Sequence, residues 1–147
     1  MKIAFASDHM GVALREQIVR IAQEHGHECL DFGTKTTDRC DYPEYAVLAC
    51  KAVQNGEAER ALLICGSGVG MSIAAGKLNG IRPVLTMDVH TARMSRRHNN
   101  TNVLCLGSRV VGSDLAETIF FEWLSSEYEG GRHQRRLDMI GVLEEGR

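Results

Sequence analysis

Apolar and polar positions alternate along the chain in blocks that predict strands separated by helices. Five short apolar runs have the length and composition of strands: Lys2–Ser7, His27–Asp31, Arg60–Cys65, Ile81–Met87 and Asn102–Gly107. The third and fifth runs are nearly continuous in apolar residues, which is typical of strands that helices cover on both faces. Segments with helical spacing fill the rest: Val12–His25, Tyr42–Asn55, Gly70–Lys77, Val89–His98, Ser113–Trp123 and Arg132–Glu144.

This order of elements predicts an α/β fold, a three-layer sandwich with a five-stranded parallel sheet, right-handed crossovers and a C-terminal helix. Two prolines and no internal repeat indicate a single domain over residues 1–147. We expect Gly26 to end the first helix, and Ser113 with Asp114 to cap the helix that follows them. In such sheets ligands bind outside the carboxyl ends of the strands.

Composition narrows the class of protein. Apolar residues make up 44% and charged residues 24% of the chain, as in ordinary globular proteins. The formal net charge of -2 argues against nucleic acid as a partner, and no apolar run reaches the ~20 residues of a membrane span. Five cysteines without a CxxC pair, and a strand pattern in place of an N-terminal leader, predict reduced thiols in the cytoplasm.

Polar clusters follow four of the predicted strands and should meet at one edge of the sheet. They are Ser7–Gly11, Cys65–Gly70, Asp88 and Gly107–Arg109. The glycines at alternate positions of Cys65–Gly70 allow close backbone approach, and their amide groups, with a helix starting at Gly70, form a cradle for an anion or oxyanion. Their spacing fits neither a P-loop nor a dinucleotide motif, and a tight turn without a ligand is the alternative.

Cys65 stands at the junction between a buried strand and this glycine loop. Backbone donors and a helix start beside the sulfur favour the thiolate form, whereas a small core residue is the alternative interpretation. The other thiols are interpreted differently. Cys29, Cys50 and Cys105 lie in apolar elements and are predicted to be core residues, and Cys40 to be an incidental exposed thiol.

Two further polar segments contain candidate site residues. His98 lies in the dense polar run Arg96–Asn102, which otherwise suits a helix end. Asp8 and His9 follow the first strand and are either ligand groups or a helix cap.

The chain also ends in a basic helix. Arg132 and Arg136 lie one turn apart on one face, which suits a phosphate. The alternative is a solvated basic face paired with Glu144 and Glu145.

Together these segments resemble the B-type ribose-5-phosphate isomerases and their relatives, the galactose-6-phosphate and allose-6-phosphate isomerases. The resemblance covers nearly the whole chain through these motifs: Ser7–Gly11, Asp41-Tyr42-Pro43, Cys65–Gly70, Arg97–Leu104, Gly107–Arg109 and Gly130–Arg136. It implies a Rossmann-like sandwich and an aldose–ketose isomerase that interconverts ribose 5-phosphate and ribulose 5-phosphate through an enediolate, with no metal and no cofactor.

The resemblance also implies roles for individual residues. Cys65 would be the base, His98 the acid that opens the sugar ring, and Ser67 a hydroxyl that moves protons between O1 and O2. The backbone of Gly66, Ser67, Gly68, Val69 and Gly70 would hold the enediolate oxygen. The remaining substrate contacts would be Asp8, His9, Asn99, Arg109, Arg132 and Arg136.

Partners and alternatives follow from the same resemblance. The family builds its pocket between two subunits, so we expect a homodimer or homotetramer acting on a phosphorylated sugar. A six-carbon sugar phosphate is the nearest alternative substrate. A non-catalytic nucleotide-sensing or receiver-like module is a distant alternative, for which Asp8 and Asp88 are the acidic candidates.

Overall fold

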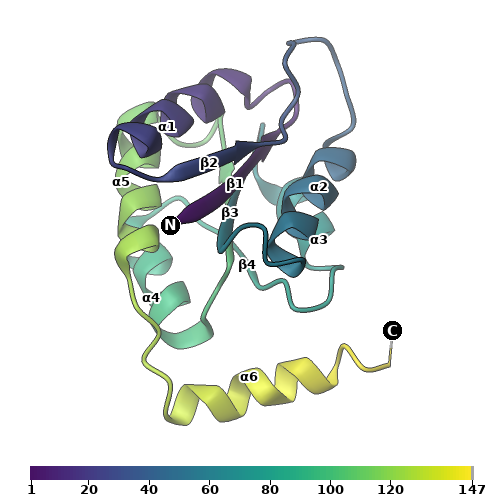
Figure 1. Cartoon of the computed structure of the whole chain (residues 1–147), viewed down its shortest axis with the longest axis vertical. Helices are drawn as coiled ribbons and strands as arrows, with labels where there is room; N and C mark the ends of the chain where they lie inside the picture. Colours follow the sequence, from purple (N-terminus) through teal and green to yellow (C-terminus); the bar gives the residue numbers. More distant parts are fainter. Residues whose placement is uncertain (147) are drawn as a thin grey trace.

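The computed structural model describes residues 1–146, which form layers around one parallel sheet (Figure 1). The strands are β1 (Lys2–Ser7), β2 (Glu28–Asp31), β3 (Arg60–Cys65), β4 (Pro83–Leu85) and β5 (Val103–Gly107). They lie in the order β2-β1-β3-β5-β4, and every neighbouring pair is parallel. The predicted α/β fold with five parallel strands is therefore confirmed.

Helices cover both faces of the sheet (Figure 1). One face carries α1 (Val12–Glu24), α4 (Val89–Asn99) and α5 (Ser113–Ser125), and the other carries α2 (Tyr42–Gln54) and α3 (Val69–Ala75). The last helix, α6 (Arg132–Val142), runs across the end of the sheet where the strands begin (Figure 1). This arrangement confirms the predicted three-layer sandwich with a C-terminal helix.

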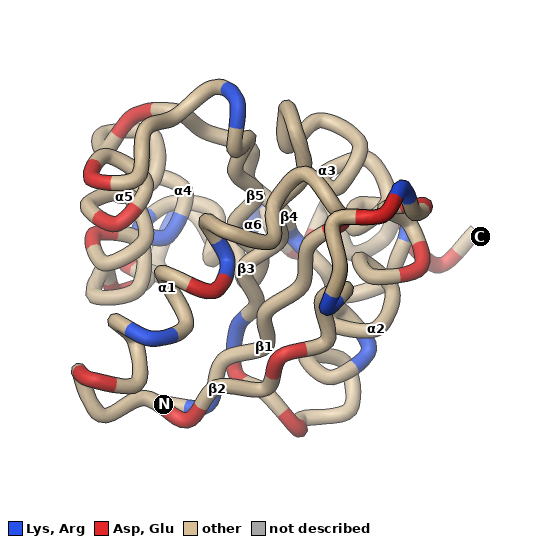
Figure 2. Tube along the Cα trace, turned by 90° about the horizontal axis from the view of Figure 1, so that it is seen from above, with Lys and Arg blue, Asp and Glu red and all other residues tan. Residues whose placement is uncertain are grey.

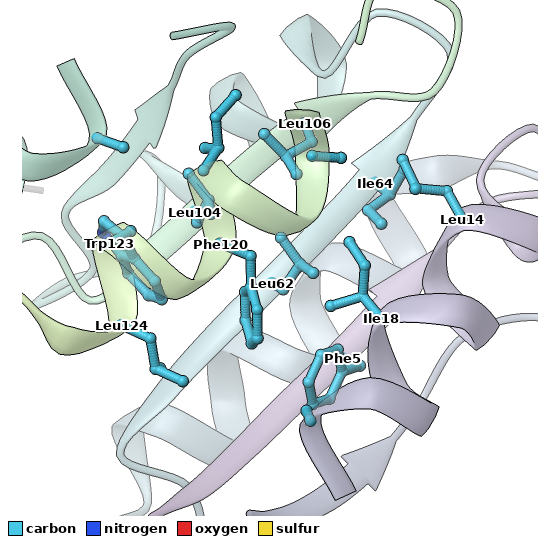
Figure 3. Packing of buried hydrophobic residues seen from close by; sticks show 14 of the residues in the cluster. Phe5, Leu14, Ile18, Leu62, Ile64, Leu104, Leu106, Phe120, Trp123 and Leu124 are labelled. Atoms are coloured by element: carbon cyan, nitrogen blue, oxygen red, sulfur yellow. The ribbon is translucent and has the colours of Figure 1, made fainter. Parts of the chain in front are cut away.

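Alternate strand residues fill two cores, because successive side chains of a strand point to opposite faces. Phe5, Leu62 and Leu104 pack with α1 and α5, where the rings of Phe5 and Phe120 lie 5.9 Å apart (Figure 3). Leu63 faces the other core, beneath α2 and α3. Each such side chain is fully buried and contributes about 1.5–3 kcal/mol to folding.

The sequence expectations for the fourth strand and for the cap of α5 were wrong. The fourth strand is shorter than Ile81–Met87, because the amide of Ile81 donates to Leu78 O in a turn and Thr86 bonds to Asp88 beyond the strand. Ser113 and Asp114 do not cap α5. Gly112 is the N-cap, with extended backbone and no side-chain hydrogen bond. Gly26 does follow the end of α1, with φ at +82°.

The order of the strands reverses between β1 and β3. From β1 the chain proceeds outward to β2, then returns to β3 on the other side of β1. The helices that follow these two strands, α1 and α3, cover opposite faces, so a crevice opens at the carboxyl ends of β1 and β3. The fold thereby brings Ser7–Gly11 beside Cys65–Gly70.

Charges of both signs are interspersed around the outside of the molecule (Figure 2). They do not gather on one face in this view, as they would on a nucleic-acid-binding surface. Among the described residues, none of the helices has the length and apolar character needed to cross a membrane.

Candidate active site

Cys65 ends β3 with its sulfur beside the glycine loop. The side chain is 5% exposed, and the amide of Gly68 donates a hydrogen bond to Sγ at 3.2 Å. Gly68 makes this contact with φ at +79°, and a Cβ there would lie 2.9 Å from the carbonyl carbon of Leu106. Only glycine fits this backbone. Gly68 is also the N-cap of α3, so the helix begins at Val69 and not at Gly70 as the sequence predicted.

Backbone hydrogen bonds hold three loops around Cys65. The amide of Asp8 donates to Ile64 O at 3.3 Å, that of Ser108 to Cys65 O at 2.9 Å, and that of Arg109 to Gly66 O at 3.0 Å. The predicted cluster at the carboxyl edge is therefore confirmed for the loops after β1, β3 and β5.

Asp8 lies buried at that edge of the sheet and its side chain is fixed by a hydrogen bond. Its side chain accepts a hydrogen bond from the amide of Met10 at 2.9 Å and the residue is 6% exposed. The N-cap of α1 is Gly11, without a side-chain hydrogen bond, so Asp8 and His9 are not the helix cap considered from the sequence. A cavity of about 380 Å³ opens between the start of α1 and the loop after β5, lined by Met10, Ser108 and Arg109 among others.

The sequence analysis assigned no functional role to two residues that the structure places at this edge, Cys40 and Tyr42. Cys40, expected to be an incidental thiol, lies against His9, whose Nδ1 accepts from the Cys40 amide at 3.3 Å. The ring of Tyr42 lies against Gly70, where a Cβ would come within 2.6 Å of its Cζ. The motif Asp41-Tyr42-Pro43 was the available signal, but nothing in the sequence showed that it folds over the glycine loop.

Cys50 and Cys105 are buried core residues, as predicted, whereas Cys29 is only half-buried against the core. Burial raises the pKa of Cys50 to about 12. Burial also raises the pKa of Cys105 well above its usual value, assisted by the nearby Cys50 and Cys65. Both therefore stay protonated near neutral pH. Cys29, Cys40, Cys50, Cys65 and Cys105 are all free thiols.

Asp88 has a structural role. Its carboxylate caps α4 by accepting from the amide of Thr91 at 2.7 Å and from the Thr86 hydroxyl at 3.3 Å. The hydrogen bonds from Thr91 lower its pKa. Because Asp88 is engaged as a cap, the acidic cluster that a receiver-like module needs is not formed at this edge by Asp8 and Asp88.

The other candidate residues lie at the opposite end of the sheet. His98 and Asn99 end α4, just before β5 begins at Val103, whereas Gly107 at the other end of β5 pairs with Cys65. Four residue steps of a strand span about 13 Å. Within one chain, the structure therefore divides the predicted site residues into a thiol group around Cys65 and a histidine group around His98.

Helix α6 adds its basic residues to the histidine group. Arg132 and Arg136 are exposed on α6. The alternative pairing of this face with the acidic tail is not supported at Glu144, whose carboxylate accepts from the amide of Gly80 at 2.9 Å. A cavity of about 640 Å³ opens between α4, β4 and α6, with Asn99 in its lining.

His98 is in contact with two residues that sequence reasoning missed, His133 and Glu129. The rings of His98 and His133 stack 4.3 Å apart and 14° from parallel. Glu129 Oε2 lies 3.8 Å from Nε2 of His98 and 3.5 Å from Nε2 of His133, while its Oε1 accepts from Nε of Arg97 at 2.5 Å. The only sequence signal was their position around Gly130-Gly131 in the basic motif.

The charge state of this group follows from its surroundings. Burial lowers the pKa of His133, as do the charges of His98 and Arg132. Partial burial raises the pKa of Glu129, but the hydrogen bond and charge of Arg97, together with the charges of His98 and His133, lower it by more. Glu129 is therefore an anion, and His133 favours its neutral form.

His98, Glu129 and His133 are residue types that bind zinc, and their ligand atoms lie within 4.8 Å of one another. The lone pair of an imidazole nitrogen lies in the ring plane, and the two rings are nearly parallel. Their lone pairs therefore do not converge on one ion, and the arrangement suits a hydrogen-bonded set.

A buried polar network fixes the chain where it leaves α4. Asn100 has φ at +46° and accepts from Arg96 through Oδ1 at 2.9 Å. Thr101 Oγ1 accepts from Trp123 Nε1 at 2.9 Å and lies 2.9 Å from the Ser95 hydroxyl. These residues of the polar run are structural, and they hold the corner from which His98 and Asn99 extend.

A thiol in a backbone cradle at the switch point of a parallel sheet defines an α/β protein with a ligand site at the strand ends. Residues 3–140 match the model of the family described as Ribose/Galactose Isomerase. The chain is 50% identical over 146 residues to ribose-5-phosphate isomerase B of Escherichia coli, covering 99% of this chain and 98% of that protein. A ribose-5-phosphate isomerase B structure from Clostridium thermocellum has a TM-score of 0.98 and 45% identity, covering 99% of each chain.

The chain is also 35% identical to D-erythrulose-4-phosphate isomerase of Pectobacterium atrosepticum, covering 98% of this chain and 95% of that protein. The class is thus that of the aldose–ketose isomerases. The chain belongs to the ribose/galactose isomerase family, and the resemblance found in the sequence motifs is confirmed.

Proposed function

We propose that this isomerase interconverts ribose 5-phosphate and ribulose 5-phosphate with Cys65 as the base, without metal or cofactor. The observation that supports the proposal is the position of Cys65 at the carboxyl end of β3, next to β1, with the Gly68 amide donating to its Sγ at 3.2 Å. That donor stabilises a thiolate more than a thiol, because hydrogen bonds to an ionised acceptor are the stronger ones.

Isomerisation requires a proton to move from C2 to C1. The thiolate of Cys65 removes the C2 proton, and the electron pair flows into the carbonyl to form an enediolate. Backbone amides from Gly66 to Gly70 then stabilise the oxygen that gains charge, and one such donor is worth roughly 3–4 kcal/mol. The hydroxyl of Ser67, which is exposed at the mouth of the loop, moves the proton between O1 and O2. Finally, Cys65 returns its proton to C1.

Binding of a complete substrate requires both groups of residues. Asp8, His9 and Arg109 lie beside Cys65, whereas ring opening by His98, a hydroxyl contact from Asn99 and phosphate binding by Arg132 and Arg136 belong to the far end of the sheet. We infer that a second copy supplies the histidine group, in a homodimer or a tetramer of such dimers. A two-fold axis would complete two equivalent sites at once.

The surface of α6 supports this pairing. Met139, Ile140, Val142 and Leu143 are 63%, 44%, 61% and 70% exposed, so the last helix presents apolar side chains that a second copy would cover. We assign residues 1–147 to a single isomerase domain, of which residue 147 lies outside the described residues. We infer that the enzyme acts in the cytoplasm.

The substrate is tested by measuring kcat/KM, with a chelator present, on aldose phosphates of four, five and six carbons. We expect ribose 5-phosphate to be preferred. A preference above tenfold, about 1.4 kcal/mol, for erythrose 4-phosphate, allose 6-phosphate or galactose 6-phosphate would overturn the substrate assignment. Stabilisation against heat by ATP or NAD, but not by ribose 5-phosphate, would favour the nucleotide-sensing alternative.

The base is tested with Cys65→Ala. We expect nearly complete loss of turnover with substrate binding retained, because the substitution removes the proton acceptor and leaves the amide cradle in place. Cys29→Ala is the matched control, since Cys29 is a half-buried thiol on the edge strand β2. Wild-type activity in Cys65→Ala would refute the assignment.

A further inference from the structure

Glu129 joins the parts of the chain that carry the histidine group. It lies in the connection between α5 and α6, and both its main chain and its side chain are fixed to the last turn of α4. Its amide donates to Arg97 O at 3.0 Å, and its Oε1 accepts from Arg97 Nε at 2.5 Å. The carboxylate is thereby held with its second oxygen, Oε2, directed at the two histidines.

We propose that Glu129 is a positioning residue for His98 in opening the sugar ring, an inference that rests on the function proposed above. Nε2 of His98 faces Glu129, so Nδ1 is the nitrogen left for the substrate. In ring opening, Nδ1–H protonates the ring oxygen as the C1–O4 bond breaks, and the C1 hydroxyl gives its proton to water as the carbonyl forms. The carboxylate holds the ring through Nε2–H and balances its positive charge before the transfer.

The surroundings restrict His98 to this orientation. The ring of His133, 5% exposed, packs flat against His98 and limits its rotation. Because Arg97 occupies Oε1, the remaining oxygen is the one offered to the histidines. The 3.8 Å separation needs to shorten by about 1 Å to become a hydrogen bond, and catalytic hydrogen bonds often tighten only when substrate binds.

The charges around the group make a carboxylate necessary. Arg97, Arg132 and Arg136 are all positive, and the electrostatic influence of Arg132 and Arg136 reaches the adjacent His133. A protonated His98 in these surroundings requires an anion beside it, and Glu129 is in contact with it. Phosphate binding by the arginines of α6 and proton donation by His98 at the end of α4 are therefore placed where the two helices meet.

The test compares Glu129→Gln with Glu127→Gln, an exposed glutamate two residues away in the same connection. Glu129→Gln keeps the shape and removes the charge, so we expect kcat/KM on ribose 5-phosphate to fall about 10- to 100-fold, part of what general acid catalysis contributes. Glu127→Gln should match wild type, and Glu129→Asp should recover part of the loss.

The deuterium isotope effect on kcat/KM for substrate labelled at C2 separates positioning from a structural role. If ring opening becomes slow in Glu129→Gln, breaking of the C2–H bond no longer limits the rate and the isotope effect falls toward unity. A loss of folded enzyme would lower the rate and leave the isotope effect unchanged. An unchanged effect with a wild-type value clearly above unity would overturn the proposal.

A second measurement observes ring opening directly. It can be used even if the wild type shows no isotope effect. Cys65→Ala cannot isomerise the sugar, but it should still open and reclose the ring, and so speed exchange between the anomers of ribose 5-phosphate observed by NMR at labelled C1. We expect Cys65→Ala/Glu129→Gln to lose at least tenfold of this exchange. Equal exchange in the two variants would overturn the role of Glu129. If Cys65→Ala did not speed exchange between the anomers, both the role of Glu129 and ring opening by His98 would be overturned. The proposed isomerase activity of the wild type would not be affected by that result.

Discussion

Gly68 is the position at which the backbone of the glycine loop and the chemistry of Cys65 are most directly linked. Its φ of +79° costs a residue with a side chain about 1–2 kcal/mol. A Cβ would also lie 2.6 Å from Leu85 Cδ1, 2.9 Å from the Leu106 carbonyl carbon and 3.1 Å from the Gly107 amide. Since two of these atoms belong to the backbone, relief requires the loop to move, which adds about 1–3 kcal/mol as overpacking.

We therefore expect Gly68→Ala to lower the free energy of unfolding by about 2–5 kcal/mol. Gly26→Ala is the matched control, because Gly26 has φ at +82° and a Cβ there would meet nothing within 4 Å. The control should lose about 1–2 kcal/mol and keep its activity. Both are measured by urea unfolding at one fixed protein concentration, because association changes apparent stability.

Activity gives the second half of the same test. Moving the loop displaces the amide that donates to Cys65 Sγ, so Gly68→Ala should lose most of its kcat even at temperatures where it is folded. The reasoning would be refuted if Gly68→Ala lost no more stability than Gly26→Ala and retained the kcat of the wild type.

Two further predictions concern residues of α4 and α6. The pKa of Asp88 is lowered in the folded protein, so its contribution to stability is present above its ordinary pKa of 3.8 and is lost as pH falls through the lower folded value. The difference in Tm between wild type and Asp88→Ala should therefore shrink on acidification from about pH 5 to about pH 2, and a constant difference would contradict this. Arg136→Ala should raise KM about tenfold with a smaller change in kcat, because a phosphate contact is lost from ground and transition states alike. Arg135→Ala is its control, because Arg135 is the neighbouring exposed arginine on α6 and has no assigned substrate contact. A fall in kcat with unchanged KM in Arg136→Ala would contradict the phosphate role.

The fold was predictable because local pattern and global structure agree. Buried strands such as Arg60–Cys65 are continuous in apolar residues, and the observed β3 has the predicted bounds. The bounds of the edge strand β4 were mispredicted. Apolar residues such as Ile81 lie in a turn, and β4 pairs with β5 alone, over only a few residues. The cap of α5 was missed for a related reason, since Ser113 is helical and the backbone of Gly112 makes the turn.

The site was only partly predictable. The residues at strand ends met as expected, since the carboxyl ends of parallel strands share one edge. Tyr42 over Gly70, and Glu129 beside His98, result from long-range packing that no local spacing encodes. The division of the predicted residues between two ends of the sheet follows from the direction of α4, which returns the chain to the start of β5.

The central claim is that one active site combines Cys65 of one copy with His98 of another, and subunit complementation tests it most directly. Cys65→Ala and His98→Asn are each expected to be nearly inactive alone. After the two variants are unfolded and refolded together in equal amounts, half of the dimers should be mixed, and each mixed dimer has one intact site. Recovery of about a quarter of wild-type activity is the predicted result for a two-fold dimer. Activity no higher than the sum of the two separate variants, in a sample shown to contain mixed dimers, would contradict the account.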